Sequence, residues 1–219
     1  ERRTRIIKMA TEFSPEDMYA DDDMVITISH LGYIKRTPLA DFRQQGRGGI
    51  GAKAGAARDE DFIEYVHQAN MHSTMMFFTE QGRLYWTKVY ELPEGNRQSK
   101  GRALQNMINI QKGDKVCAFI HVKNLNDMEY VQNHYLIFAT KDGLMKKTTL
   151  ESYSRPRANG IIALGLREGD RLIRVTLTDG NSQMLVASYN GKVVRFPEDT
   201  VRPMGRTATG VRAIKLDED

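Results

Sequence analysis

The sequence contains a single cysteine, Cys117, and no long apolar run. One cysteine excludes a disulfide framework and a cysteine-based zinc site, and it is the usage expected in a reducing cytoplasm. No segment approaches the roughly 20 apolar residues needed to cross a bilayer, and no signal peptide opens the chain, so we expect no membrane partner and a cytoplasmic location. The chain begins at Glu1 rather than methionine, which indicates a piece of a longer protein.

Signatures of catalysis are missing as well. The five histidines lack the H-E-x-x-H spacing of a metal site, and neither a P-loop nor a G-x-S-x-G elbow occurs. Cys117 lies within the apolar run 116–120, which predicts a buried small hydrophobe rather than a nucleophile. We therefore expect no enzyme activity, catalytic residue, metal or cofactor in this chain by itself.

The charge balance of the chain is uneven. The 32 basic and 28 acidic side chains give a net charge of +4. Residues 1–22 carry four cations and six anions, which is typical of an N-terminal segment with an acidic linker, so the basic excess belongs to residues 23–219. A globular domain with 40% hydrophobic residues is predicted there.

Four segments of this domain share one pattern, in which an apolar run is followed by a glycine turn and a second strand. Each turn glycine suits the positive φ of a tight hairpin. A second glycine follows after 19, 19, 17 and 19 residues, and it precedes a short strand of small residues. The apolar runs and their turn glycines are 24–28 with Gly32, 75–79 with Gly82, 135–139 with Gly143, and 184–188 with Gly191. The second glycines are Gly51, Gly101, Gly160 and Gly210.

The first three repeats continue into a further strand, at 62–66, 116–122 and 172–177. Four short strands in each unit of about fifty residues are typical of a propeller blade. The sequence therefore predicts an all-β, propeller-like array of about four blades with four strands each. The approximate repeats are 23–70, 71–132, 133–181 and 182–219.

Two departures from the repeat are informative. Residues 123–133 form an insertion that we expect to be a surface loop between blades. The fourth repeat lacks its last strand, and Arg5–Met9 could supply it and close the array.

Cations recur after each turn, in the second strand and the loop that follows it. A ring of blades would bring them to one edge as a curved basic track, which suits a phosphate backbone. The alternative for any single lysine is a solvated strand end. The cations are Lys35, Arg36, Arg43 and Arg47; Arg83, Lys88, Arg97, Lys100 and Arg102; Lys146, Lys147, Arg155 and Arg157; and Lys192, Arg195, Arg202 and Arg206.

The loop 44–51 is the densest feature. Its glycines formally match G-x-G-x-x-G, but the preceding residues form a poor strand and Met71 stands where the acidic residue of a dinucleotide site is required. Exposed backbone N–H groups and the Arg47 guanidinium can instead approach phosphates. We assign DNA contacts to Gln45, Arg47, Gly48, Gly49 and Gly51.

This loop resembles the signature box in the C-terminal domain of the DNA gyrase A subunit, which belongs to the bacterial type IIA topoisomerases. Gln45–Gly51 matches the box at five of seven positions and departs from it at Gly46 and Ile50, where two cations are replaced. The phrases 34–37, 82–90, 191–196 and 209–212 are similar to the repeats of the same family, so the resemblance covers 23–219.

The resemblance implies a β-pinwheel whose basic rim binds, bends and wraps duplex DNA without sequence specificity. It further implies that this chain serves negative supercoiling by a nucleoid-associated holoenzyme with two A and two B subunits, which uses ATP and Mg²⁺. Six repeats are usual in gyrase, and four are visible here. Two alternatives remain open: the equivalent domain in the A subunit of topoisomerase IV, and a propeller that acts as a protein-interaction scaffold.

Overall fold

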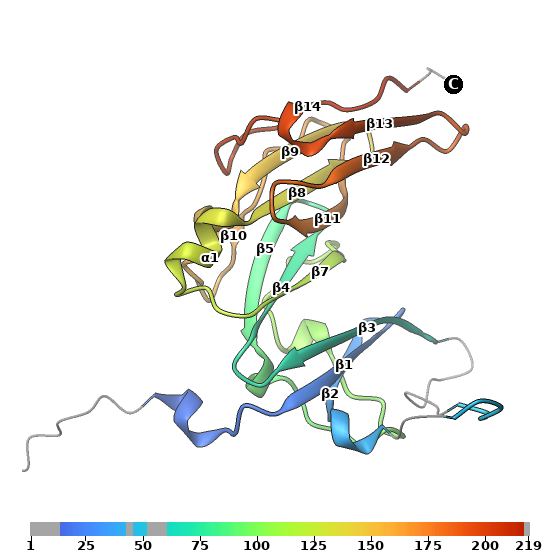
Figure 1. The fold of residues 1–219 in the computed structure, drawn as a ribbon, viewed down its shortest axis with the longest axis vertical. Coiled ribbons are helices and arrows are strands. Elements are labelled where there is room, and N and C mark those ends of the chain that lie inside the picture. The colour runs from blue at the N-terminus through green and yellow to red at the C-terminus, as the bar shows by residue number, and fades with distance from the viewer. Residues whose placement is uncertain (1–13, 43–45, 52–60, 217–219) are drawn as a thin grey trace, which may run out of the picture.

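The computed structural model describes residues 14–42, 46–51 and 61–216, and these form an almost entirely β structure (Figure 1). The strands are β1 Asp23–Ser29, β2 Tyr33–Pro38, β3 Ile63–Asn70, β4 Thr74–Thr79, β5 Arg83–Lys88, β6 Arg102–Ala103, β7 Val116–Val122, β8 Tyr135–Thr140, β9 Leu144–Thr149, β10 Ile161–Ile162, β11 Leu172–Thr178, β12 Gln183–Ala187, β13 Val193–Pro197 and β14 Val211–Arg212. The single α-helix of the described residues is α1 Met128–Asn133. The short 3₁₀ helices are η1 Pro15–Met18, η2 Leu39–Asp41, η3 Val89–Glu91, η4 Leu104–Asn106, η5 Leu150–Tyr153 and η6 Glu198–Thr200.

Four antiparallel hairpins form the repeated unit, and they follow one another along the long axis of the molecule (Figure 1). β1 pairs with β2, β4 with β5, β8 with β9, and β12 with β13. The turn glycines have φ between 76° and 83°, because only glycine adopts this region without steric cost. The prediction of an all-β fold built from repeated sheets is confirmed.

In the first three sheets, one edge strand comes from the following repeat. The sheets have the strand orders β3-β1-β2-β6, β10-β5-β4-β7 and β11-β8-β9-β14, and the fourth sheet has β12-β13 among the described residues. A sequence repeat therefore does not coincide with a sheet, and local spacing does not reveal the exchanged partner. The exchanged pairs are Ile34 with Arg102, Leu84 with Ile161, and Met145 with Val211.

The second glycine of each repeat makes this exchange possible. It lies just before the exchanged strand, with φ of 82° at Gly101, 65° at Gly160 and 103° at Gly210. A Cβ atom at these glycines would approach a carbonyl oxygen of the preceding sheet to 2.3, 2.6 and 2.5 Å, respectively. The regular glycine spacing therefore reflects a close backbone contact between consecutive repeats.

The core lies between the sheets. Because side chains alternate along a strand, β4 sends Met75 and Phe77 into the cluster shared with the first sheet, and Met76 and Phe78 into the cluster shared with the third. A smaller cluster around Met145 joins the third sheet to the fourth. The strands β1 and β4 are therefore buried on both faces, apart from the exposed first residue of β1.

The insertion 123–133 is not a plain surface loop. It contains α1, whose first turn is capped by the Asp127 side chain and whose Val131 is fully buried. The idea that Arg5–Met9 closes the array concerns residues outside the described ranges. No helix of the described ranges is long and apolar enough to cross a membrane.

The acidic linker contacts the body of the protein where the structure describes it. Tyr19 stacks on Tyr90 with 4.8 Å between the ring centroids, and its carbonyl oxygen lies 2.8 Å from Nε2 of His72. Glu16 forms an ion pair with Lys88. Lys88 also donates a hydrogen bond to the carbonyl oxygen of His72, so it holds the linker in place and is not a bare rim cation.

Candidate nucleic-acid interface

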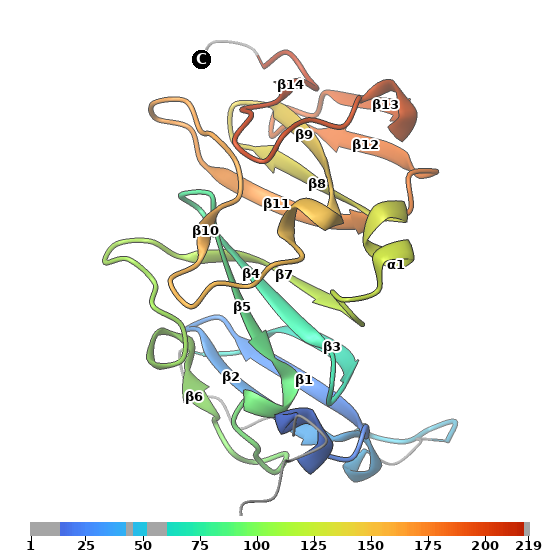
Figure 2. The same ribbon diagram turned by 90° about the vertical axis from the view of Figure 1, so that its left-hand side faces the viewer.

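Three equivalent loops connect a 3₁₀ helix to an exchanged strand. They comprise residues 92–101, 154–160 and 201–210, and they follow η3, η5 and η6. Each loop ends in a strand at the edge of the preceding sheet, so the loops recur from sheet to sheet along one side of the molecule. Figure 2 shows their strands β6, β10 and β14 in succession from the first repeat toward the last.

The loops and their exchanged strands carry cations and no acidic residues from Gly95 to Arg102, from Ser154 to Gly160 and from Val201 to Arg212. Most of these cations are exposed, and Arg206 is half-buried. This brings together seven of the predicted contact residues, and it adds Arg212, which was absent from the predicted contact set. The predicted ones are Arg97, Lys100, Arg102, Arg155, Arg157, Arg202 and Arg206.

The loop of the first repeat is described only from Gly46 to Gly51. A hydrogen bond of 3.1 Å from Gly49 N to Gly46 O closes a turn, and Arg47 and Ile50 are exposed. Gly48 and Gly51 both have φ of 83°. The predicted contacts Arg43 and Gln45 lie outside the described residues.

Four predicted contact residues lie in the interior instead of on the rim. Lys35 and Lys146 are 1% and 0% exposed, and Arg36 and Lys147 are 7% and 4% exposed. Their strands are covered by the loop of the next repeat, and this long-range contact leaves no periodic trace in the sequence. The prediction that these side chains point to solvent is wrong.

The two buried lysines donate to backbone oxygens. Nζ of Lys35 lies 2.8 Å from the carbonyl oxygen of Asn96 and 3.0 Å from that of Arg97. Nζ of Lys146 lies 2.7 Å from the carbonyl oxygen of Ala163 and also contacts that of Arg206. Removal from water lowers the pKa of Lys35, and burial together with the Arg206 charge lowers the pKa of Lys146 to about 7.

The neighbouring cations are paired. Arg36 donates from Nε to the carbonyl oxygen of Leu92 at 2.8 Å, and its guanidinium lies 2.9 Å from the Glu94 carboxylate. Lys147 forms an ion pair of 3.0 Å with Glu198, which is 1% exposed. Both cations therefore join one repeat to the next.

The remaining predicted contacts are distributed over β5 and the last hairpin. Arg83 is half-buried and donates to the carbonyl oxygen of Asn159 at 2.9 Å, so it holds the loop 154–160. Lys192 and Arg195 are exposed on the hairpin of β12 and β13, outside the three loops in sequence.

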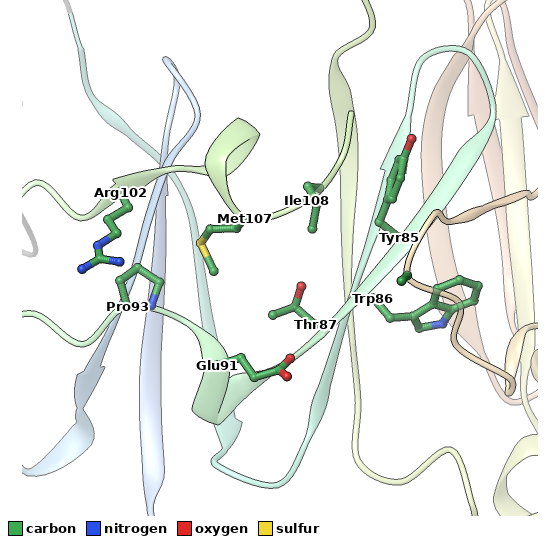
Figure 3. A pocket seen from close by; sticks show the side chains of 9 residues that line it. Tyr85, Trp86, Thr87, Glu91, Pro93, Arg102, Met107 and Ile108 are labelled. Atoms are coloured by element: carbon green, nitrogen blue, oxygen red, sulfur yellow. The ribbon is translucent and has the colours of Figure 1, made fainter. Parts of the chain in front are cut away.

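A pocket of about 400 Å³ is lined by residues of the first two loops and their surroundings, including Pro93, Arg102 and Ala158. In Figure 3, Arg102 lies on the opposite side of this pocket from Trp86. Trp86 lines it and donates from its indole nitrogen to the carbonyl oxygen of Tyr153 at 3.1 Å. Tyr85 is 2% exposed and belongs to the core.

Cys117 is half-buried instead of buried as predicted, and its Sγ lies 3.5 Å from the carbonyl oxygen of Phe78. Burial raises the pKa of its thiol to about 12, so the thiolate is scarce near neutral pH. The described residues contain no cluster of three or more His, Cys, Asp or Glu side chains that could hold a metal ion.

Comparison with known proteins places this geometry in context. A family model described as the DNA gyrase C-terminal domain, beta-propeller, matches residues 23–70, 73–123, 134–179 and 183–219. The DNA gyrase A subunit of Salmonella typhimurium is 46% identical over 219 residues, which are 100% of this chain and 24% of that protein. The chain thus spans about a quarter of the length of the curated relatives that it matches.

Two solved structures have a similar fold. The C-terminal domain of DNA topoisomerase IV has a TM-score of 0.74 at 29% identity, over 91% of this chain and 59% of that one. A DNA gyrase A C-terminal domain has a TM-score of 0.68 at 22% identity, over 90% of this chain and 62% of that one. The second likeness concerns the fold alone.

Proposed function

The chain belongs to the DNA gyrase C-terminal domain family, and from that premise we propose that it is a DNA-binding module of a type IIA topoisomerase. It binds duplex DNA along the loops 92–101, 154–160 and 201–210, which we call the rim loops. The binding is electrostatic and geometric, and this chain performs no chemical step.

One observation supports this proposal above the others: residues 95–102, 154–160 and 201–212 of the rim loops and exchanged strands carry exposed cations and no acidic residues. Other cations are matched by carboxylates: Arg36 pairs with Glu94, which precedes Gly95 in the first rim loop, and Lys147 pairs with Glu198. Among the described residues, none of the cations in these segments forms an ion pair, so on successive sheets they form a positive stripe. Such a stripe binds phosphates by releasing condensed counterions, without reading bases.

We further propose that the DNA bends as it follows the stripe from sheet to sheet. Bending 20–30 base pairs by 40–90° costs on the order of 1–6 kcal/mol, and phosphate contacts at several rim loops must offset this cost. Arg47 extends the stripe to the first repeat. The replacement of two box cations by Gly46 and Ile50 leaves Arg47 as the charged side chain between Gly46 and Gly51.

Within the whole topoisomerase, we propose that this module wraps DNA and so supports negative supercoiling. The partners are the gyrase B subunit together with the rest of the gyrase A subunit, in an A₂B₂ complex. The use of ATP and Mg²⁺ belongs to those parts. The partly preserved box favours gyrase over topoisomerase IV, whose equivalent domain remains the second candidate.

The test is a salt titration of binding to a long duplex, measured by filter binding. We expect log K to fall linearly with log salt, by roughly 0.9 for each phosphate neutralised. Arg97→Ala, Arg155→Ala and Arg47→Ala should each reduce the slope by about one contact. Lys123→Ala, which removes an exposed cation outside the rim loops, is the matched control. A flat salt dependence would contradict the proposal and favour a protein-interaction scaffold.

A further inference from the structure

The rim loop 92–101 is fastened along β2 of the preceding repeat. Arg36 N donates to the carbonyl oxygen of Pro93 at 2.9 Å, and Gly95 N donates to the carbonyl oxygen of Arg36 at 3.0 Å. The Thr37 hydroxyl adds a hydrogen bond of 2.8 Å to the carbonyl oxygen of Gly95. These bonds fix the first half of the loop, up to Gly95.

One buried side chain of β2 reaches the second half of the loop. The ammonium of Lys35 reaches across from β2 and donates to two successive carbonyl oxygens, those of Asn96 and Arg97. Asn96 also starts a tight turn, because its carbonyl oxygen accepts from Ser99 N at 3.1 Å. Lys35 therefore holds, from beneath, the turn that carries the exposed Arg97 and Lys100.

The third sheet repeats this arrangement with the rim loop 201–210. Lys146 occupies the place in β9 that Lys35 occupies in β2, and its ammonium contacts the carbonyl oxygen of Arg206. The backbone is fastened in the same way, since Met204 N donates to the carbonyl oxygen of Lys147 at 2.8 Å. In two sheets, a buried ammonium thus holds the rim loop of the next repeat.

The second sheet provides a natural contrast. Tyr85 takes the equivalent place in β5, and its loop is held by Arg83, which donates to the carbonyl oxygen of Asn159. Within the described residues, no carboxylate lies within ion-pair distance of Lys35 or Lys146. A cation buried without a carboxylate is costly, whereas an apolar side chain such as methionine would fill this space without that cost. The charged donor must therefore have a purpose other than packing.

We propose that Lys35 and Lys146 are positioning residues for DNA binding: each buried ammonium shapes the rim loop of the next repeat and so presents its cations to the phosphates. This inference rests on the proposed function. Neither ammonium can reach a phosphate, because both side chains are almost fully buried. Their effect on DNA passes through Arg97 and Lys100 in one loop and through Arg202 and Arg206 in the other.

The test uses Lys35→Met in the full chain, with a long duplex as the probe. Methionine keeps the apolar stem and removes the ammonium. We expect DNA binding to weaken about five- to tenfold, while the slope of log K against log salt stays within a few tenths of wild type, because every exposed cation remains on the loop and still displaces counterions. Arg97→Ala is the contrasting variant, whose slope should fall by roughly 0.9.

A double-mutant cycle separates positioning from direct contact. In a background with Arg97→Ala and Lys100→Ala, Lys35→Met should weaken binding by less than about twofold, because the loop no longer carries the side chains that it positions. Additive losses, a slope reduced by about one contact, or wild-type affinity of Lys35→Met would each overturn the inference.

Hydrogen exchange distinguishes loop positioning from general instability. Lys35→Met should speed exchange at Ser99 N and leave the amides of β8 and β9 unchanged. If the variant does not fold, Thr37→Val is the second variant, since it removes only the hydroxyl bond to Gly95. Thr37→Val should also weaken DNA binding without changing the slope of log K against log salt. Wild-type affinity of this variant would count against the inference. If the Arg97→Ala, Lys100→Ala variant itself binds DNA with wild-type affinity, that result contradicts the proposed function, and it is distinct from any result obtained with Lys35→Met.

Discussion

Replacing Gly101 by alanine should destabilise the junction between the first and second repeats far more than an ordinary glycine replacement does. Gly101 has φ of 82°, and a Cβ there would lie 2.3 Å from the carbonyl oxygen of Ile34. Left-handed backbone costs an alanine about 1–2 kcal/mol. Steric overlap in a packed region adds about 1–3 kcal/mol, so we expect a total loss of roughly 2–5 kcal/mol.

Gly113 supplies a matched control for this prediction. Its φ is 87°, but nothing lies within 4 Å of the Cβ that alanine would add. Gly113→Ala should therefore cost only the backbone part, about 1–2 kcal/mol. The difference between the two variants isolates the contact between consecutive repeats.

Urea unfolding followed by the fluorescence of Trp86, the only tryptophan, measures both variants. Trp86 reports on the second sheet, which receives the close contact of the next repeat at Gly160. Equal losses for Gly101→Ala and Gly113→Ala would refute the reasoning, since they would mean that the exchanged strand tolerates a Cβ at its entry.

Buried groups support three further predictions. The pKa of Lys146 falls from 10.5 to about 7 on folding, so its burial opposes folding fully below pH 7, and this penalty fades as the pH rises toward 10.5. In urea unfolding, the free energy of unfolding of wild type should therefore rise by a few kcal/mol across that window, and that of Lys146→Met should rise less. Glu198→Leu should leave Lys147 buried without its ion-pair partner and lower the free energy of unfolding by about 3–5 kcal/mol. Adding Lys147→Met should recover most of this loss, because the equivalent first residues of η3 and η5 are the apolar Val89 and Leu150. Cys117 should resist iodoacetamide at pH 8 in the folded protein and react once urea unfolds it, as mass spectrometry would show, because burial raises its pKa to about 12.

The hairpins could be predicted from the sequence because their signals are local. An apolar run, a glycine turn and a second strand lie within about 15 residues, and β1, β4, β8 and β12 begin within one residue of the predicted apolar runs. The exchange of the fourth strand could not be predicted in this way. Its partner lies in another repeat, and the only trace is the regular position of Gly101 and its equivalents.

The residues of the candidate interface were likewise predicted correctly where the signal is local and wrongly where a distant segment covers them. The cations in loops were predicted to be exposed, and the structure agrees at residues such as Arg97 and Arg155. The cations in β2 and β9 were misplaced, because what covers Lys35 is a segment that begins more than fifty residues later. Charge pattern alone does not separate a rim cation from one that fastens the rim, and long-range packing decides between them.

The most direct test of the central claim is the linking number of DNA closed around the protein. Nicked circular DNA is ligated in the presence of the chain, and the topoisomers are then separated on a gel. If duplex DNA bends along the rim loops of successive repeats, wild type and Lys123→Ala should shift the linking number equally. A variant with Arg97→Ala, Arg155→Ala and Arg202→Ala should lose most of the shift. No shift for wild type, or an unchanged shift for the triple variant, would contradict the account.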